Sequence, residues 1–542
     1  MELGAAGPEV FKGEVDGVGE QAHNNSAAQA AITDAAAARM GIPDPTNRVG
    51  TKLNAPVRRP SSQNGHDPAP RRGGQPQRHS VAAMKMIAST SDRQPTYLRN
   101  KRLGLFAGAV SIALVVAGCA SSNGPASSSA QPSSPIAAST AAANPNPGVG
   151  PLAATPLTVA EGTIPGLANG QSVEIPQGWT AEVWANVPGA RLATWTPDGK
   201  LLVSSPDRSA VIALTPTEPG KAPTQETLID ELDKPQGLAF TSDGTALVVG
   251  ESTRVVAYDY KDGKVSNERV LADNLPTGGH SAKGVAVDGD TVYYSVGSSN
   301  NRIPGDRTAT PARATIWQVN IDGEGNSVVA TGVRNGMALA IAPDHTLFSG
   351  VNQMDDQPYP FDDGSGNYGK QVPEYINENP VDQVSRVTAG AELGWPLCVP
   401  DTRATPDLLN IPYVNDPQFN ADGSQLDCAA LAPTMLGLPS HSAPLGLSFT
   451  AGTPLERQIG SGALITTHGS WNRETPRAPG VAFSPWDSTT NSLGATVPLV
   501  GGFQSDNGDR WGRTVAAVVG SDGSLYVTDD EAGLVYRITP GT

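Results

Sequence analysis

One short phrase recurs along the chain from about residue 175, and this repeat constrains the fold more than any other feature. Each copy holds a small apolar run, a turn that is usually Asp-Gly, and a second apolar run. The first three turns, at Asp198-Gly199, Asp243-Gly244 and Asp288-Gly289, are spaced 45 residues apart. Asp-Gly between apolar runs indicates a β-hairpin, because glycine adopts positive φ without steric cost. Six copies begin near residues 192, 237, 284, 338, 445 and 515.

A repeat length in the forties, with several strands per copy, is typical of propeller blades. A single blade cannot bury both of its faces, so the copies must close into a ring. We therefore predict an all-β, six-bladed β-propeller over 171–542, with residues 181–187 supplying the strand that closes the ring. The alternative is an irregular β-sandwich. Two stretches, 352–440 and 485–512, break the period, and long loops on a rigid scaffold usually carry function.

An export signal is predicted over residues 99–119. Three cations precede an apolar run of 14 residues that begins at Leu103. This run is too short to span a membrane, which takes about 20 residues, and fits the core of a signal peptide. It ends in Val-Ala-Gly-Cys119, which resembles the bacterial lipobox, although a short membrane anchor with an incidental cysteine is the alternative. We expect an exported protein that a lipid on Cys119 anchors to the bacterial cell envelope, on its periplasmic or extracellular face.

The segments on either side of this signal are predicted to lack a packed core. Residues 1–98 contain almost no aromatic side chains and are expected to be a disordered extension. Because an export signal rarely begins a hundred residues into a chain, we expect translation to start later, for example at Met84 or Met86. Residues 120–170, which begin with many Ser, Ala, Pro and Asn residues, are predicted to be a flexible linker.

Charge and cysteine content limit the partners and the compartment. Residues 119–542 hold 23 basic and 44 acidic residues, a net charge of −21. Like charge repels phosphate backbones and anionic lipid, so we expect no nucleic-acid binding and no membrane contact beyond the lipid anchor. Cys398 and Cys428 lie in the exported part, where a disulfide between them is favoured. Two cysteines alone make a poor zinc site, which normally needs four N or S ligands.

Histidines are few in the propeller region, and three of them lie beside predicted blade strands. His280 leads directly into the third repeat copy, and His441 and His468 flank the first strand pair of the fifth. These positions place them near one mouth of the ring, although a loop histidine is more often a solvated surface residue. His345 occupies the glycine place of a blade turn, so we expect a purely structural role for it.

Cations are also scarce here, so those next to blade strands are notable. They are Arg334, which is directly followed by Asn335 in the sequence, and the two arginines Arg473 and Arg513. A guanidinium binds a carboxylate through two parallel hydrogen bonds, which favours an anion clamp. The alternative is surface pairing with the many carboxylates of the chain.

Several phrases in residues 273–542 also carry a family resemblance. They are GGHSAKGVAVDGDTVYYSVGSSNN (278–301), RATIWQVNIDGEGNSVVATGVRN (313–335), LFSGVNQMDD (347–356), LGWP (393–396), HSAPLGLSF (441–449), HGSWNR (468–473) and WGRTVAAVVGSDGSLYVTDDEAGLVYRI (511–538). In their order and spacing they resemble the soluble quinoprotein sugar dehydrogenases, specifically the sorbosone dehydrogenase branch of the glucose/sorbosone dehydrogenases.

The resemblance implies a propeller that binds pyrroloquinoline quinone and calcium in its central mouth. It also implies oxidation of an aldose or related sugar at C1, with electrons passing to a quinone or cytochrome acceptor. The cofactor is a planar ortho-quinone with three carboxylates, so a clamp of arginine and polar side chains suits it. Calcium is a hard Lewis acid that takes oxygen ligands and polarises a carbonyl.

Residue roles follow from the same resemblance. His280 matches the general base, a task that suits neutral imidazole near pH 7. Arg334 and Asn335 match the pair beside the quinone, and Arg513 matches a carboxylate-binding arginine. The other matches are cofactor or substrate contacts at His468, Trp471, Asn472 and Arg473, a mouth position at His441, and a calcium-holding segment at Gln353, Met354 and Asp355, partly through backbone oxygens.

The chain departs from the family pattern at three places. Residues 352–357 lack an arginine that the family usually has, Lys283 stands where arginine is frequent, and Thr514 replaces a proline. Two alternative functions therefore stay open. One is a calcium-dependent propeller lactonase, which would need no arginine clamp. The other is a non-catalytic binding propeller that has lost the cofactor.

Overall fold

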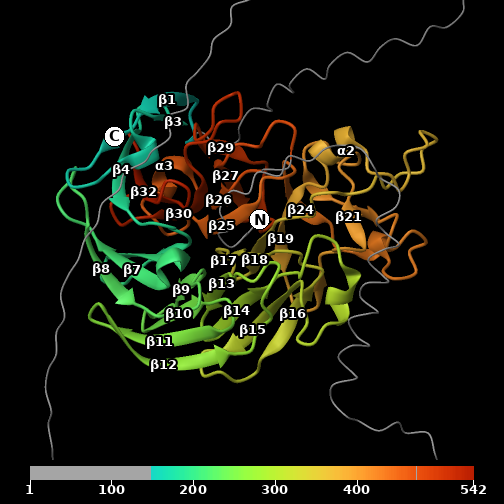
Figure 1. Cartoon of the computed structure of the whole chain (residues 1–542), viewed down its shortest axis with the longest axis horizontal. Coiled ribbons are helices and arrows are strands. Elements are labelled where there is room, and N and C mark those ends of the chain that lie inside the picture. The colour runs from blue at the N-terminus through green and yellow to red at the C-terminus, as the bar shows by residue number, and fades with distance from the viewer. Residues whose placement is uncertain (1–147, 471–472, 542) are drawn as a thin grey trace, which may run out of the picture. The chain divides into compact units, whose positions relative to one another are not determined.

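The computed structural model describes residues 148–470 and 473–541. Within these residues the strands form six blades around a common axis and two further two-stranded sheets (Figure 1). The predicted all-β, six-bladed propeller is therefore confirmed. None of the helices in these two ranges is long and apolar enough to cross a membrane. The predictions for 1–98, for 99–119 and for the first part of the linker lie outside the described residues.

Each repeat copy supplies the two innermost strands of one blade. Blades one and two are antiparallel sheets whose strands follow the chain order from the axis to the rim. Their strands are β5 (Ala193–Trp195), β6 (Leu201–Ser205), β7 (Ala210–Thr215) and β8 (Thr224–Ile229), then β9 (Leu238–Phe240), β10 (Ala246–Gly250), β11 (Val255–Lys261) and β12 (Lys264–Ala272). Figure 1 shows β9 close to the centre and β8 and β12 at the rim.

Blades three, four and five gain strands from the stretches that break the repeat. Blade three consists of β13 (Val285–Asp288), β14 (Thr291–Val296), β15 (Thr315–Asn320), β16 (Ser327–Thr331) and the parallel β20 (Ala391–Glu392). Blade four consists of β17 (Ala338–Ile341), β18 (Leu347–Val351), β19 (Asp382–Val387), β24 (Thr434–Leu438) and β22 (Leu409–Ile411). Blade five consists of β25 (Pro444–Phe449), β26 (Gly462–Thr467), β27 (Gly480–Asp487), β28 (Ser492–Leu493) and β29 (Val497–Val500). Two short helices, α2 (Pro373–Glu378) and α3 (Glu456–Ile459), lie in connections of blades four and five.

Blade six joins strands from both ends of the propeller. Its inner strands come from the C-terminal repeat copy, whereas β4 pairs antiparallel with β32, with Thr180 opposite Thr539 and Asn186 opposite Leu534. The closing strand predicted over 181–187 is therefore confirmed. The strands of this blade are β30 (Thr514–Val519), β31 (Leu525–Asp529), β32 (Leu534–Thr539), β4 (Thr180–Asn186) and β2 (Thr158–Val159).

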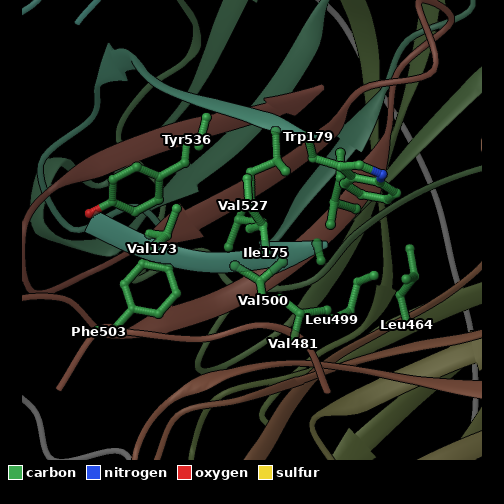
Figure 2. Packing of buried hydrophobic residues seen from close by; sticks show 14 of the residues in the cluster. Val173, Ile175, Trp179, Leu464, Val481, Leu499, Val500, Phe503, Val527 and Tyr536 are labelled. Carbon is green, nitrogen blue, oxygen red and sulfur yellow. The ribbon is translucent and has the colours of Figure 1, made fainter. Parts of the chain in front are cut away.

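Apolar side chains fill the spaces between neighbouring blades, and each of these spaces has its own buried cluster. Figure 2 shows the cluster between blades five and six, where Val481 and Val500 of one blade meet Val527 and Tyr536 of the other. Residues of the six inner strands, most of them apolar, also line a small cavity on the axis. The core is therefore distributed around the ring, and each blade depends on both of its neighbours.

The last part of the predicted linker is folded. β1 (Leu152–Pro156) pairs antiparallel with β3 (Ser172–Pro176), and β2 lies on the edge of blade six. The reason is the alternation in β3, where Val173 and Ile175 are buried in the cluster between blades five and six (Figure 2). The folded region therefore begins about 20 residues before the predicted boundary at residue 171.

The irregular stretch between β19 and β24 has a small core of its own around a disulfide. Cys398 and Cys428 are joined, with their Cα atoms 5.6 Å apart, as the sequence favours. β21 (Cys398–Pro400) pairs with β23 (Tyr413–Asn415), and Leu397 packs beside the bridge. The bridge therefore stabilises a segment that has little apolar surface to bury.

The closing strand generates a stability prediction. Trp184 of β4 is 2% exposed and packs edge-on against Tyr526, with ring centroids 4.8 Å apart. Trp184→Ala removes this packing at the joint of the ring, so we expect a loss of about 3–5 kcal/mol in the free energy of unfolding. The measurement is the urea midpoint. Thr180→Ala, an exposed position in the same strand, should change stability by less than about 0.5 kcal/mol, and equal midpoints for the two variants would contradict the prediction.

Candidate active site

Polar residues lie together at one end of the propeller axis. They do so because the first hairpin of every blade runs in the same direction along the axis. The inner strand begins at this end, turns at the opposite end, and returns through the antiparallel second strand. Residues that precede the inner strands therefore meet residues that follow the second strands, at the end of the ring that we call the mouth. Backbone hydrogen bonds join the blades here. Gly237 N–H donates to the Lys283 carbonyl over 2.9 Å, and Ser298 N–H donates to the Arg334 carbonyl over 2.7 Å.

His280 lies in the loop before β13 and is 8% exposed. Its Nδ1 is 3.2 Å from the carbonyl oxygen and 2.9 Å from the hydroxyl oxygen of Ser298. Burial, and after it the positive charge of Arg334, lowers the pKa of His280 well below its usual value. The ring is therefore neutral near pH 7, the state that a general base needs.

Arg334 and Asn335 lie just before β17 and are 2% and 1% exposed. The Arg334 guanidinium donates to the carbonyls of Asn301 and Asn352, each over 3.1 Å, and lies 3.5 Å from the Asp355 carboxylate. The side-chain nitrogens of Asn335 and Asn352 are buried and have no hydrogen-bond partner in the described part of the chain. Buried donors are normally paired, so these two amides mark a place that a bound ligand would complete.

His441 and two carboxylates form the neighbouring part of the mouth. His441 Nδ1 lies 3.8 Å from Asp355, and Nε2 lies 2.7 Å from the carbonyl of Ile376 in α2. Burial acts to lower the pKa of His441, but the contacts with Asp355 and Ile376 outweigh it and the pKa is raised. Asp382 accepts two backbone N–H groups over 2.7 Å each, one after β18 and one before β25, and burial raises its pKa to about 6. Asp382 therefore holds the two loops together.

Asp530, which directly follows β31, has partners from three blades. Arg191 and Arg513 each donate to its carboxylate over 2.7 Å, and His468 Nε2 lies 3.1 Å away. Burial alone would raise the pKa of Asp530, but these partners hold it well below the usual value. Burial lowers the pKa of His468 to about 3, so this imidazole is neutral and donates to the carboxylate. The structure thus brings His468 and Arg513 together around an acid that the sequence did not single out.

Arg473 is placed differently from the other predicted residues. It donates to the carbonyl of Asn377 over 3.0 Å and pairs with Glu378, both in α2. Its contacts within the described residues are with this helix and with Thr475, not with His280 or Arg334. Trp471 and Asn472 lie outside the described residues. Arg473 therefore fastens α2 to the loop after β26.

The loop after β18 offers oxygen atoms to a hard cation. The carbonyl oxygens of Gln353 and Met354 accept no hydrogen bond from any residue that the structure describes. The Asp355 carboxylate follows them directly. These are ligand types that Ca²⁺ takes. In residues 148–470 and 473–541 no group of three or more His, Cys, Asp or Glu side chains is arranged to hold a metal, so a cation here would depend on backbone oxygens and on a bound ligand.

Three cations are buried around the mouth. Arg191, Lys283 and Arg334 are 7%, 0% and 2% exposed. The Lys283 ammonium donates to the carbonyl of Ser281. Arg191 pairs with Asp530 and Arg334 with Asp355, and the three cations together concentrate positive charge at the mouth, which suits a ligand with several carboxylates.

Sequence reasoning missed Arg191, Asp382 and Asp530 as parts of the site. Arg191 lies shortly before β5, as Lys283 and Asn335 lie shortly before β13 and β17. The equivalent position at the start of the first repeat copy could therefore have indicated Arg191 as a site residue. Asp530 follows β31 in the position that Asn352 and His468 take after β18 and β26. Aligning the ends of the second strands, as well as the starts of the first, would have found it. Asp382 begins a third strand and had no such signal.

The Asp530 cluster generates a prediction with a defined pH dependence. Asp530→Asn leaves Arg191 buried without its carboxylate, so we expect a loss of about 3–5 kcal/mol in stability at pH 7. Because the folded-state pKa of Asp530 is depressed, its stabilising effect is complete above the unfolded pKa of about 3.9 and is lost as pH falls further. Urea unfolding at pH 7 and pH 3 tests this. The difference between wild type and variant should shrink at pH 3, and a difference that grows there would refute it. Asp522→Asn, which affects an ion pair at the opposite end, should cost less than about 1 kcal/mol.

Comparison with known proteins agrees with this architecture. The chain is similar over 71% of its length, at 20% identity and a TM-score of 0.59, to the whole of the holo form of a pyranose dehydrogenase PQQ domain from Coprinopsis cinerea. It is similar over 68% of its length, at 20% identity and a TM-score of 0.58, to 96% of a calcium structure of a Trichoderma reesei enzyme of carbohydrate-active family AA12.

A curated protein of Borreliella burgdorferi, described as uncharacterised, is 25% identical over 263 residues, which are 48% of this chain and 60% of that protein. The chain thus spans less than two thirds of that relative. The predicted resemblance to quinoprotein sugar dehydrogenases is confirmed, and it extends through blades one and two. A family model described as TrAA12-like matches residues 173–541, which include every blade strand except β2, and the chain therefore belongs to the TrAA12-like family.

Proposed function

We propose that this protein oxidises an aldose or related sugar at C1 with pyrroloquinoline quinone and calcium bound in the mouth. The observation that carries the proposal is the buried, neutral His280 beside Arg334, next to two buried amides that lack a partner in the described chain. The similarity in fold to a pyranose dehydrogenase PQQ domain supports it. When bound, the quinone accepts a hydride and calcium polarises its carbonyl.

The residues that would hold the quinone are those that match its charge. Lys283 and Arg334 supply buried positive charge, and the side-chain nitrogens of Asn335 and Asn352 supply donors for its oxygen atoms. Arg513 and His468, which Asp530 holds in place, would also contact the quinone. The predicted contacts of Trp471, Asn472 and Arg473 with cofactor or substrate stay predictions.

The residues that would hold calcium are in the loop after β18. Gln353 and Met354 would bind through their carbonyl oxygens and Asp355 through its carboxylate. Asp355 already lies between Arg334 and His441, so it would link the cation to the guanidinium and to the histidine. His441 would line the sugar pocket beside α2.

His280 would act as the general base. Its task is to remove the proton from the C1 hydroxyl while the hydride leaves the same carbon. A neutral imidazole performs this task without first losing a proton. The two electrons would then pass to a quinone or cytochrome acceptor.

The role of His280 is tested by a pair of histidine variants of the full chain. His280→Ala should reduce sugar-dependent dye reduction by about 10²–10⁴-fold, while binding of the quinone, followed by its absorbance, persists. His345 is the matched control, because it is exposed, adopts φ 62° in the turn of blade four, and its imidazole pairs with Asp288, away from the mouth. His345→Ala should keep wild-type turnover. Full activity of His280→Ala would exclude it as the base, and failure of the wild type to bind the quinone would exclude the proposed chemistry.

We also propose that the protein is exported and held at the cell envelope by a lipid on Cys119. The support is the lipobox-like sequence and the short apolar run before it. In a bacterial host fed a radiolabelled fatty acid, the wild type should carry label and remain with membranes. Cys119→Ser should carry none, whereas Cys398→Ser should still be labelled. Equal labelling of wild type and Cys119→Ser would refute the anchor.

A further inference from the structure

We infer that Arg313 and Ser298 are positioning residues for His280. Arg313 fixes the loop that carries the imidazole, and Ser298 fixes the imidazole proton on Nδ1, so that Nε2 faces the substrate as the proton acceptor. The inference deepens the proposed function, since it rests on His280 as the base.

Ser298 presents two acceptors to one nitrogen of His280. Its carbonyl oxygen is an acceptor by nature, and its hydroxyl donates its own proton to the carbonyl of Asn300 over 2.6 Å. The hydroxyl therefore also meets Nδ1 as an acceptor, over 2.9 Å. A ring nitrogen that faces two acceptors carries the proton, and in a neutral imidazole the other nitrogen then keeps its lone pair. Nε2 is thus the basic atom.

Arg313 binds the backbone on both sides of this imidazole. Arg313 is 8% exposed and lies before β15. Its guanidinium donates hydrogen bonds to four backbone carbonyl oxygens. Two acceptors belong to the loop that leads into His280, and two belong to the segment that contacts its Nδ1. The acceptors are Thr277 (3.1 Å), Gly278 (2.7 Å), Gly297 (3.1 Å) and Ser298 (3.2 Å). The planar, forked guanidinium reaches all four at once, which a lysine ammonium cannot do.

The backbone around His280 has no spare room. A Cβ on Gly297 would lie 2.6 Å from His280 Cβ, and one on Gly279, where φ is +56°, would lie 2.2 Å from the carbonyl oxygen of Ser299. The two segments therefore touch through glycines, and Arg313 holds them at that distance. Loss of the clamp would move the imidazole without removing it.

The charges that face His280 are few. Arg334 and Asp355 act on it electrostatically from the mouth, and the Arg313 guanidinium, which lies near Asp306, contacts the backbone on both sides of it. The groups on Nδ1 are neutral oxygens. A carboxylate placed at residue 298 would therefore stabilise the protonated ring and make His280 a stronger base.

The first test does not depend on turnover. The full chain is labelled with ¹⁵N-histidine, and the His280 signals are assigned by their loss in His280→Gln. Long-range ¹H–¹⁵N correlation at pH 7 should show a protonated Nδ1 and an unprotonated Nε2. A protonated Nε2 with a bare Nδ1 would overturn the inference. If this tautomer is found but the wild type oxidises no sugar with added quinone and calcium, the proposed function fails while the positioning of the imidazole stands.

The second test uses kinetics. Arg313→Lys should lower kcat by about 100-fold through misplacement of the base, with KM and quinone binding unchanged. Arg537→Lys, which alters contacts with Glu182 and Asp522 at the opposite end of the propeller, is the matched control and should keep wild-type kcat.

Ser298→Thr should retain activity. Ser298→Asp should raise the pH at which activity is lost on the acid side by about 1–3 units. Wild-type kcat in Arg313→Lys, or an unmoved acid limb in Ser298→Asp, would overturn the inference.

Discussion

The pairing of β4 with β32 is the interaction on which the rest of the structure depends. It joins residues from the two ends of the folded region, with Arg537 of β32 placed 3.5 Å from Glu182 of β4. Without this joint, blade six would end at an open strand edge, and the apolar surfaces between blades six and one would face water. The mouth depends on the same closure, because Arg191 of blade one and Asp530 of blade six share a hydrogen bond there.

The two ends of the propeller differ in what they bury. At the mouth, charged side chains are almost fully buried. The free-energy cost of their desolvation is offset by hydrogen bonds and ion pairs with residues of neighbouring blades. Asp530 illustrates this, since its three partners come from blades one, five and six. At the opposite end lie the tight Asp-Gly turns, which need only glycine's positive φ, such as the 84° of Gly199. The cost of buried charge is therefore concentrated where a ligand would use it.

Much of this architecture was predictable from sequence because it is local or periodic. The Asp-Gly turns reveal the hairpins, their spacing reveals the blades, and the closing strand follows from the need to bury the last face. His280 and Arg334 were found because they precede inner strands and match a family. What could not be predicted depends on contacts between distant segments. Asp382 bridges two loops through backbone N–H groups that carry no sequence signature, and Arg473 turns to α2, a helix formed by an irregular stretch. The folding of residues 152–176 depends on the buried cluster between blades five and six, which exists only once these two blades are adjacent.

The position of the closing strand has a consequence for how the chain acquires its structure. β4 is synthesised before any of the six repeat copies, and its partner β32 is the last strand that the structure describes. A nascent propeller emerging from the ribosome can build five blades in order, but the edge of β4 that pairs with β32 stays open until β32 has been made. Because this contact spans almost the whole folded region, ring closure is a late and entropically slow step of folding. The propeller therefore becomes a closed ring only after β32 has been synthesised, and a chain cut short in this strand would leave two exposed sheet edges, on which chaperones and proteases act.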